Sequence, residues 1–259
     1  GANEPDLYDA LDRVLADQGS GFWSAVKEFS VWRFFTGPFA DDQHLRFARH
    51  ISGVEVNGRI ALSQLPLEGR LSERPARETG SVYLNVDLGE GSEALADDRL
   101  LFELSSGGGE AWYVAALVFD GQGAHRMLET EIEGGQGALA VDGLGGAQHV
   151  VFVITALGDL EHDPDDQDWD PIYFEYGLRV VRQPRIERVT PETLAPGSQG
   201  AAVLLQSRGF DPGLQVELGP DLTLRSQVAD HDGDELALVI DVAPQAPPGW
   251  RPLTLRNAL

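Results

Sequence analysis

The densest group of potential ligand side chains is an acidic stretch, EHDPDDQDWDP, at residues 161–171. Hard carboxylate oxygens are the ligands that Ca²⁺ prefers, and this stretch is therefore our candidate calcium site. Its five aspartates are Asp163, Asp165, Asp166, Asp168 and Asp170. Their spacing lacks the central glycine and the terminal glutamate of an EF-hand loop. A solvated, acidic loop between two strands is the competing interpretation, and both remain open at this point.

A second acidic segment, DHDGDE at residues 230–235, begins like a calcium-binding loop. Asp230, Asp232 and Asp234 alternate as ligands of such a loop do. However, Gly233 comes too early, and Asp241 occupies the position at which a bidentate glutamate is needed. We therefore predict a structural turn between two strands.

Catalytic signatures are missing from the sequence. There is no cysteine, which excludes disulfides, thiolate zinc sites and cysteine nucleophiles. None of the histidines has a partner at the spacing of a helical zinc motif; they are His44, His50, His125, His149, His162 and His231. The sequence also lacks a nucleophile elbow and a phosphate-binding loop. We predict no catalytic residue and no cofactor-binding residue, with calcium as the one candidate cofactor.

Two tryptophans suggest carbohydrate stacking as another binding chemistry. Trp112 begins an apolar run, AWYVAALVF, and is predicted to lie in the core. Trp169, in the acidic stretch, is the better candidate for exposure. A calcium-dependent or carbohydrate-binding β-sandwich is therefore one hypothesis for function.

The overall charge disfavours several partner classes. With 19 basic and 42 acidic residues, the 259-residue chain has a formal net charge of −23 and a pI near 4.4. Such a surface repels nucleic-acid phosphates and anionic lipid head groups. No apolar run reaches the roughly 20 residues of a membrane-spanning helix. The 30 glycines and 15 prolines indicate many turns, as in a β-rich fold.

The first 52 residues are predicted to be helical. One helix begins after Asp6 in LYDALDRVLADQ, and a second spans FWSAVKEFSVWRFFTG, where Gly37 suits a left-handed helix end. Helical periodicity predicts a buried stripe in the second helix, formed by Phe22, Ala25, Val26, Phe29 and Trp32. Further aromatic residues point in other directions. We therefore expect a two-sided core, in which a protein partner or a missing N-terminal part of the same protein packs on the 22–35 helix.

The remaining chain is predicted to form two consecutive antiparallel β-sandwich, Ig-like domains, at residues 53–182 and 183–259. Strand candidates in the first are residues 81–88, 99–105, 111–119, 125–132, 138–143, 149–157 and 172–181. Short strands joined by glycine-rich turns are typical of such sandwiches. The fold class is therefore mainly β with a helical N-terminal segment.

Three phrases in the last domain, in order, resemble an IPT/TIG-type Ig-like domain. They are PRIERVTPETLAPGSQG, VLLQSRGFDPGLQVELG and APQAPPGWRPLTLRN, and Leu255 stands where that family often has valine. The resemblance implies an extracellular spacer or interaction module without shared catalytic residues.

The helical segment resembles another group. DALDRVLADQGSGFWSAVKEFSVWRFFTG is similar to a segment that follows the active-site helix in a group of secreted bacterial metalloproteases. The zinc motif of that group, His-Glu-x-x-His, is absent from this chain. The resemblance implies the non-catalytic C-terminal part of such a protein.

These observations favour a non-catalytic, extracytoplasmic (secreted, periplasmic or cell-surface) spacer or interaction segment of a larger protein. The alternative is the C-terminal part of a processed secreted zinc metalloprotease. We expect no nucleic-acid partner and no membrane span.

Overall fold

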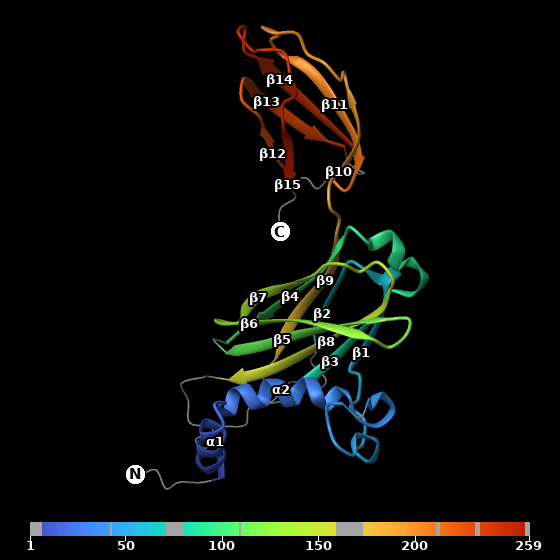
Figure 1. Ribbon diagram of the computed structural model, residues 1–259, viewed down its shortest axis with the longest axis vertical. Helices are drawn as coiled ribbons and strands as arrows, with labels where there is room; N and C mark the ends of the chain where they lie inside the picture. Colours follow the sequence, from blue (N-terminus) through green and yellow to red (C-terminus); the bar gives the residue numbers. More distant parts are fainter. Residues whose placement is uncertain are drawn as a thin grey trace. The chain divides into compact units, whose positions relative to one another are not determined.

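The computed structural model describes residues 7–41, 43–70, 80–108, 110–158, 173–210, 213–230 and 234–256. The chain divides into two compact units. Unit 1 comprises Gly1–Ala96 and Leu100–Val180, and unit 2 comprises Asp97–Arg99 and Val181–Leu259. The fold is mainly β, with two N-terminal helices and several antiparallel sheets (Figure 1), as the sequence predicts. The finer division into 1–52, 53–182 and 183–259 stays a prediction.

The described strands of unit 1 form two sheets. The five-stranded sheet has the order β1 (Gly58–Ala61), β3 (Ser81–Asp87), β8 (Ala147–Gly158), β5 (Ala111–Asp120) and β6 (His125–Ile132). The four-stranded sheet has the order β2 (Leu67–Arg70), β9 (Phe174–Val181), β4 (Arg99–Ser106) and β7 (Gln136–Val141). β1 pairs with β3 in parallel, whereas β3–β8, β5–β8, β5–β6, β2–β9 and β4–β7 are antiparallel.

The inner faces of these sheets form the largest core of unit 1. Phe174 and Leu178 lie on the same face of β9 and are buried in this core, as the period-two pattern predicts. Trp112 is fully buried, and its indole N–H donates a hydrogen bond of 3.2 Å to Ser106 Oγ. The predicted core position of Trp112 is therefore confirmed. A fully buried indole has no exposed face that could stack on a sugar.

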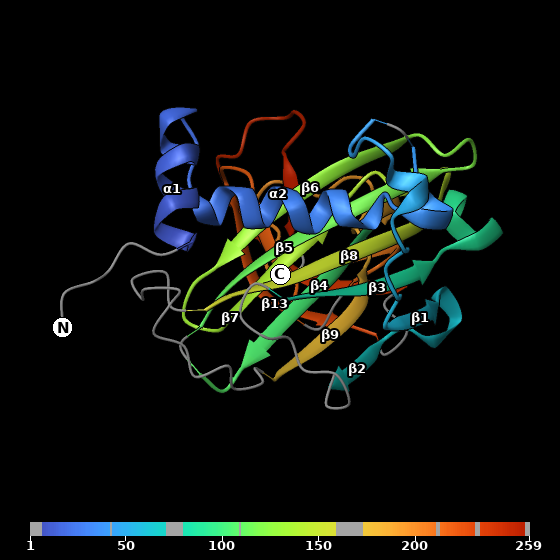
Figure 2. The same cartoon turned by 90° about the horizontal axis from the view of Figure 1, so that it is seen from below.

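The outer face of the five-stranded sheet is covered by helix α2 (Phe22–Phe34), which Figure 2 shows lying across the strands. Val31 and Phe34 of α2 are buried against Tyr113 and Leu117 of β5. Strand β5 is therefore covered on both faces. This double cover explains why AWYVAALVF is apolar throughout and shows no alternation.

The predicted buried stripe of α2 is wrong at its centre. Phe29 is 57% exposed, whereas Ser30 is buried and accepts a hydrogen bond of 2.8 Å at its carbonyl oxygen from the Tyr83 hydroxyl. Apolar residues surround this helix on most sides, so its sequence does not define a single inward face. The sheet selects the face that carries Val31 and Phe34.

Helix α1 (Leu7–Asp17) precedes α2 and is joined to it by a side-chain cap. Asp12 Oδ1 accepts a hydrogen bond of 2.8 Å from the backbone N–H of Phe22, in the first turn of α2, where N–H groups lack helical partners. Leu11 and Val14 of α1 nevertheless remain 42% and 53% exposed. Unit 1 also contains the short 3₁₀ helices Gly37–Phe39, Ala48–His50, Leu62–Gln64 and Gly89–Leu95.

Unit 2 is a smaller β structure. Its four-stranded antiparallel sheet has the order β10 (Arg185–Thr190), β11 (Ala201–Arg208), β14 (Glu235–Val242) and β13 (Leu222–Ala229). A second, two-stranded sheet pairs β12 (Gln215–Leu218) with β15 (Leu253–Arg256). Leucine, valine and isoleucine side chains from both sheets share one core with Phe210, which follows β11.

Candidate functional site

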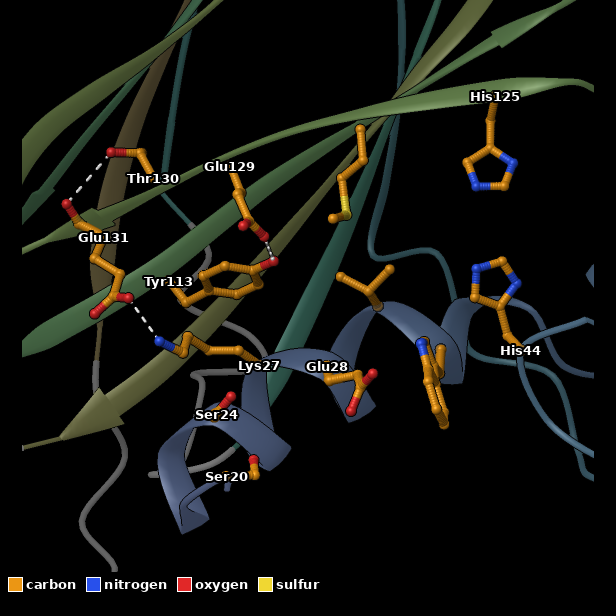
Figure 3. Close-up of a pocket in the computed structure, with 13 residues that line it drawn as sticks. Ser20, Ser24, Lys27, Glu28, His44, Tyr113, His125, Glu129, Thr130 and Glu131 are labelled. Atoms are coloured by element: carbon orange, nitrogen blue, oxygen red, sulfur yellow. Dashed lines mark hydrogen bonds and ion pairs between the residues drawn. The ribbon is translucent and has the colours of Figure 1, made fainter. Parts of the chain in front are cut away.

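A groove of about 810 Å³ lies between helix α2 and strand β6, on the outer face of unit 1 (Figure 3). The helix contributes Ser24, Lys27, Glu28, Val31 and Trp32. The strand contributes His125, Met127, Glu129, Thr130 and Glu131. Ser20, His44 and Tyr113 complete the lining. We consider this groove the candidate functional site.

The spacing of these residues follows from the two elements. The helical residues recur at intervals of three and four, which places them along one side of α2. His125, Met127, Glu129 and Glu131 are every second residue of β6, so they project from one face of the strand. Residues that lie far apart in the sequence therefore face each other across the groove.

The middle of the groove is held by two charge-assisted contacts. Lys27 Nζ lies 2.6 Å from Glu131 Oε1, which joins the helix to the strand. The Tyr113 hydroxyl, on the floor, donates a hydrogen bond of 2.5 Å to Glu129 Oε2. Burial raises the pKa of Tyr113 above its ordinary value, and the adjacent Glu129 and Glu131 carboxylates raise it further. The phenol therefore remains a proton-bearing donor near neutral pH.

One end of the groove carries two histidines. His44 donates from Nδ1 to Asp41 Oδ2 over 2.7 Å, and its ring stacks on Phe35 with a centroid distance of 4.0 Å. The ring centroid of His125 lies 5.6 Å from that of His44 and 4.8 Å from that of Phe35. The imidazole of His44 is thus oriented by Asp41, and both His44 and His125 lie against the ring of Phe35.

The electrostatics at this end favour neutral His125. Burial lowers its pKa below the ordinary value, the neighbouring His44 lowers it further, and Asp41 partly opposes the shift. For Asp41, burial favours the protonated form, but hydrogen bonds from the backbone N–H groups of Gln43 and His44 outweigh it and lower the pKa. Asp41 is therefore an ionised acceptor that fixes the orientation of His44.

A backbone clasp positions the loop that carries His44. Gly37 has φ +57°, and a Cβ at this position would lie 2.6 Å from the backbone nitrogen of Gly53. Only glycine combines that conformation with so close an approach. The Arg33 guanidinium donates to Thr36 Oγ1 and to the Ser52 carbonyl oxygen, at 2.5 and 2.6 Å. The two ends of the loop are therefore fixed beside the C-terminus of α2.

The candidate calcium ligands Asp163, Asp165, Asp166, Asp168 and Asp170 lie outside the described residues, as does Trp169. In the second acidic segment, Asp230 Oδ1 accepts hydrogen bonds from the N–H groups of Asp234 and Glu235 at 2.9 and 3.0 Å, in the connection between β13 and β14. These bonds agree with the predicted turn.

In the ranges that the structure describes, no group of three or more His, Cys, Asp or Glu side chains is arranged to hold a metal ion. In the same ranges, no helix has the length and apolar character that crossing a membrane requires.

Sequence reasoning missed the groove residues. Sequence spacing alone does not relate His44 to His125, whereas the fold places their ring centroids 5.6 Å apart. One signal was present in HRMLETEI, where polar residues occupy both faces of the strand. That composition is typical of an exposed edge strand, and it marks β6 as the side of the sheet that a ligand can reach.

Comparisons with known proteins leave the family open. No protein-family model matches the sequence, and no curated protein matches it. Among solved structures, the chain was aligned with the glycoside hydrolase domain of Endo-D from Streptococcus pneumoniae R6, with 12% sequence identity and a TM-score of 0.23. The alignment covers 80% of this chain and 38% of that chain, and a likeness this weak carries no functional argument.

Proposed function

We propose that this chain is a non-catalytic interaction segment of a larger extracytoplasmic protein and that unit 1 binds a protein partner in the groove between α2 and β6. The observation that carries the proposal is the lining of this groove. Its floor contains buried Val31 and Tyr113, Met127 is 47% exposed, and glutamates form the rim. Aromatic residues and methionine surrounded by polar groups are typical of protein-binding surfaces.

The acid and base groups of the groove support binding rather than catalysis. Lys27 is paired with Glu131, and the Tyr113 hydroxyl is engaged by Glu129. The ring neighbours of His44 are Trp32, Phe35 and His125. The Asp41–His44 pair therefore serves, in this proposal, to shape one end of the groove.

The role of unit 2 in this proposal is that of an IPT/TIG-like spacer. The support comes from the three phrases that resemble this family, because apolar residues of each contribute to one core. Phe210 of the second phrase is buried in that core, and Val189 of the first phrase and Leu253 of the third pack against it. The resemblance also supports an extracytoplasmic location.

Site-specific photocrosslinking tests the proposed function. The full chain would carry benzoylphenylalanine in place of Glu28, an exposed groove residue, or in place of Glu68, an exposed residue of β2. In cells of the source organism, we expect one discrete protein adduct from position 28 and none from position 68. The proposal is wrong if position 28 yields no adduct, or if the purified chain shows a hydrolytic activity that His44→Ala abolishes.

The second candidate function is the C-terminal part of a secreted metalloprotease. One observation favours it: the apolar residues Leu11 and Val14 of α1 are largely exposed, although such residues on a helix normally face a partner. The preceding part of a protease would cover them. An open reading frame without a His-Glu-x-x-His motif upstream of residue 1 would eliminate this candidate.

A further inference from the structure

Strand β6 is an edge strand that borders the groove. It pairs with β5 on one side and stands at the end of the five-stranded order. Among the strands that the structure describes, none pairs with its other side, and Figure 2 shows this free edge beside α2. An edge strand offers a row of N–H and C=O groups, which an added strand can satisfy by main-chain hydrogen bonds.

The side chains of β6 define what an added strand would meet. Side chains that lie opposite each other on neighbouring strands are about 4.5–5.5 Å apart. Alternate side chains of an added strand would therefore lie beside Met127, Glu129 and Glu131. Glu28 of α2 lies at the same groove and forms no ion pair with another described residue. The Tyr113 hydroxyl binds Glu129 without neutralising it, so the groove keeps a negative charge.

Charge decides which occupant fits. Lys27 is the one lysine or arginine in the lining, and the carboxylate of Glu131 already pairs with it. Glu28 and Glu129 therefore remain to attract a cationic side chain. A second copy of this chain would bring another net charge of −23, and repulsion between the two copies would oppose their association. A basic segment is instead attracted by both the groove and the whole protein.

The apolar residues of the groove set the second requirement. Met127 is 47% exposed on β6, and Val31 and Trp32 of α2 line the same groove. Methionine adapts its shape to varied apolar partners. An extended segment with an apolar residue among its basic residues would bury this surface while its cations meet the glutamates.

We propose that β6 accepts an extended, basic segment of a partner protein as a sixth strand of this sheet. This inference rests on the proposed function and names the class of partner. Main-chain hydrogen bonds to β6 hold the segment, and contacts with Glu28, Glu129 and Met127 select basic and apolar side chains.

Fluorescence anisotropy with labelled peptides tests the inference on the full chain. The probe is a short peptide that alternates lysine and valine. We expect it to bind saturably and to weaken at high salt, as exposed ionic contacts do. N-methylation of alternate peptide bonds should reduce affinity at least about tenfold, because the added strand loses its donors. An alternating glutamate–valine peptide should not bind.

Matched variants localise the binding. Glu28→Lys and Glu129→Lys should each weaken binding about tenfold, which corresponds to about 1.4 kcal/mol, while Glu68→Lys in β2 should leave it unchanged. Glu28 lies on an exposed helical surface, so its variant tests the inference even if Glu129→Lys affects folding. Circular dichroism confirms the fold of each variant.

Three results would overturn the inference: no binding of the lysine–valine peptide, binding that tolerates N-methylation, or equal effects of the Glu28 and Glu68 variants. Sedimentation that shows a dimer lost on Glu129→Lys would also overturn it, because a second copy would then occupy β6. A photocrosslinked partner at position 28 together with any of these results would leave the proposed function intact while removing this inference.

Discussion

The two faces of the five-stranded sheet in unit 1 are covered by different kinds of element. The inner face packs on another sheet, which buries Phe152 and Trp112 completely. The outer face is covered by α2, and Met127 on the edge strand remains 47% exposed. A helix is roughly 10–12 Å wide, whereas five strands about 4.8 Å apart extend much farther. The groove is thus the part of the sheet that one helix is too narrow to cover.

The largest loss of stability should result from a substitution on the inner face of this sheet. Phe152 is fully buried and stacks on Phe102 with a ring-centroid distance of 4.9 Å. We expect Phe152→Ala to lower the free energy of unfolding by roughly 3–5 kcal/mol, because it removes buried area and leaves a cavity. Urea denaturation followed by circular dichroism measures this loss. A loss below about 1 kcal/mol would show that the inner core is loosely packed.

A slightly smaller effect is expected where α2 meets the outer face. Phe34 is buried and lies 6.0 Å from Tyr83 and 5.8 Å from Phe119, between ring centroids. Phe34→Ala should cost about 3 kcal/mol. Phe29→Ser, on the exposed side of the same helix, should change stability by no more than about 0.5 kcal/mol. If both variants were equally destabilised, α2 would pack through the stripe that its sequence suggests.

A single hydrogen bond between the helix and the outer face should have a modest effect. The Tyr83 hydroxyl donates to the carbonyl oxygen of Ser30 over 2.8 Å, and burial raises the pKa of Tyr83 to about 12. Tyr83→Phe should cost about 1 kcal/mol, measured by urea denaturation. Ultraviolet titration of the wild type should also show a tyrosine that ionises near pH 12. Ionisation at the ordinary value of 10 would place Tyr83 in contact with solvent.

The smallest expected effect is a pH dependence of folding stability, to which histidines of the outer face contribute. Burial lowers the pKa of both His125 and His149 below the ordinary 6.5. His44 adds to the shift at His125, where Asp41 opposes it, and Asp87 opposes the shift at His149. The unfolded chain therefore binds protons first as the pH falls. The stability that these residues provide is present above about pH 6.5 and declines below it.

Melting temperatures between pH 7.5 and 5 test this sign. The wild type should lose more thermal stability over this interval than the double variant His125→Gln/His149→Gln, which keeps the ring positions polar but cannot titrate. The matched control is His50→Gln, an exposed residue of the 3₁₀ helix at residues 48–50. An identical pH profile for the wild type and the double variant would contradict the predicted shifts.

The strands were predictable where a repeating pattern was long enough. Residues 125–132 were predicted as a strand and match β6 within its observed bounds. The strands β1 and β2 were missed because GRIA and LEGR are too short to show a period. The burial of α2 was mispredicted because its apolar residues point in many directions. The groove could not be predicted, because it requires knowing which strand lies beside which helix.

The clasp between Gly37 and Gly53 has a practical consequence. Because the backbone meets itself there, the intervening loop leaves and returns at nearly one place, and its length is not dictated by the distance between α2 and the sheet. Exposed loop tips are the positions at which inserted sequence is most often tolerated. A reporter peptide placed at the exposed residue Arg46 would therefore lie close to the groove without interrupting α2 or β6. The loop is thus a natural attachment point for sensing occupancy of the groove.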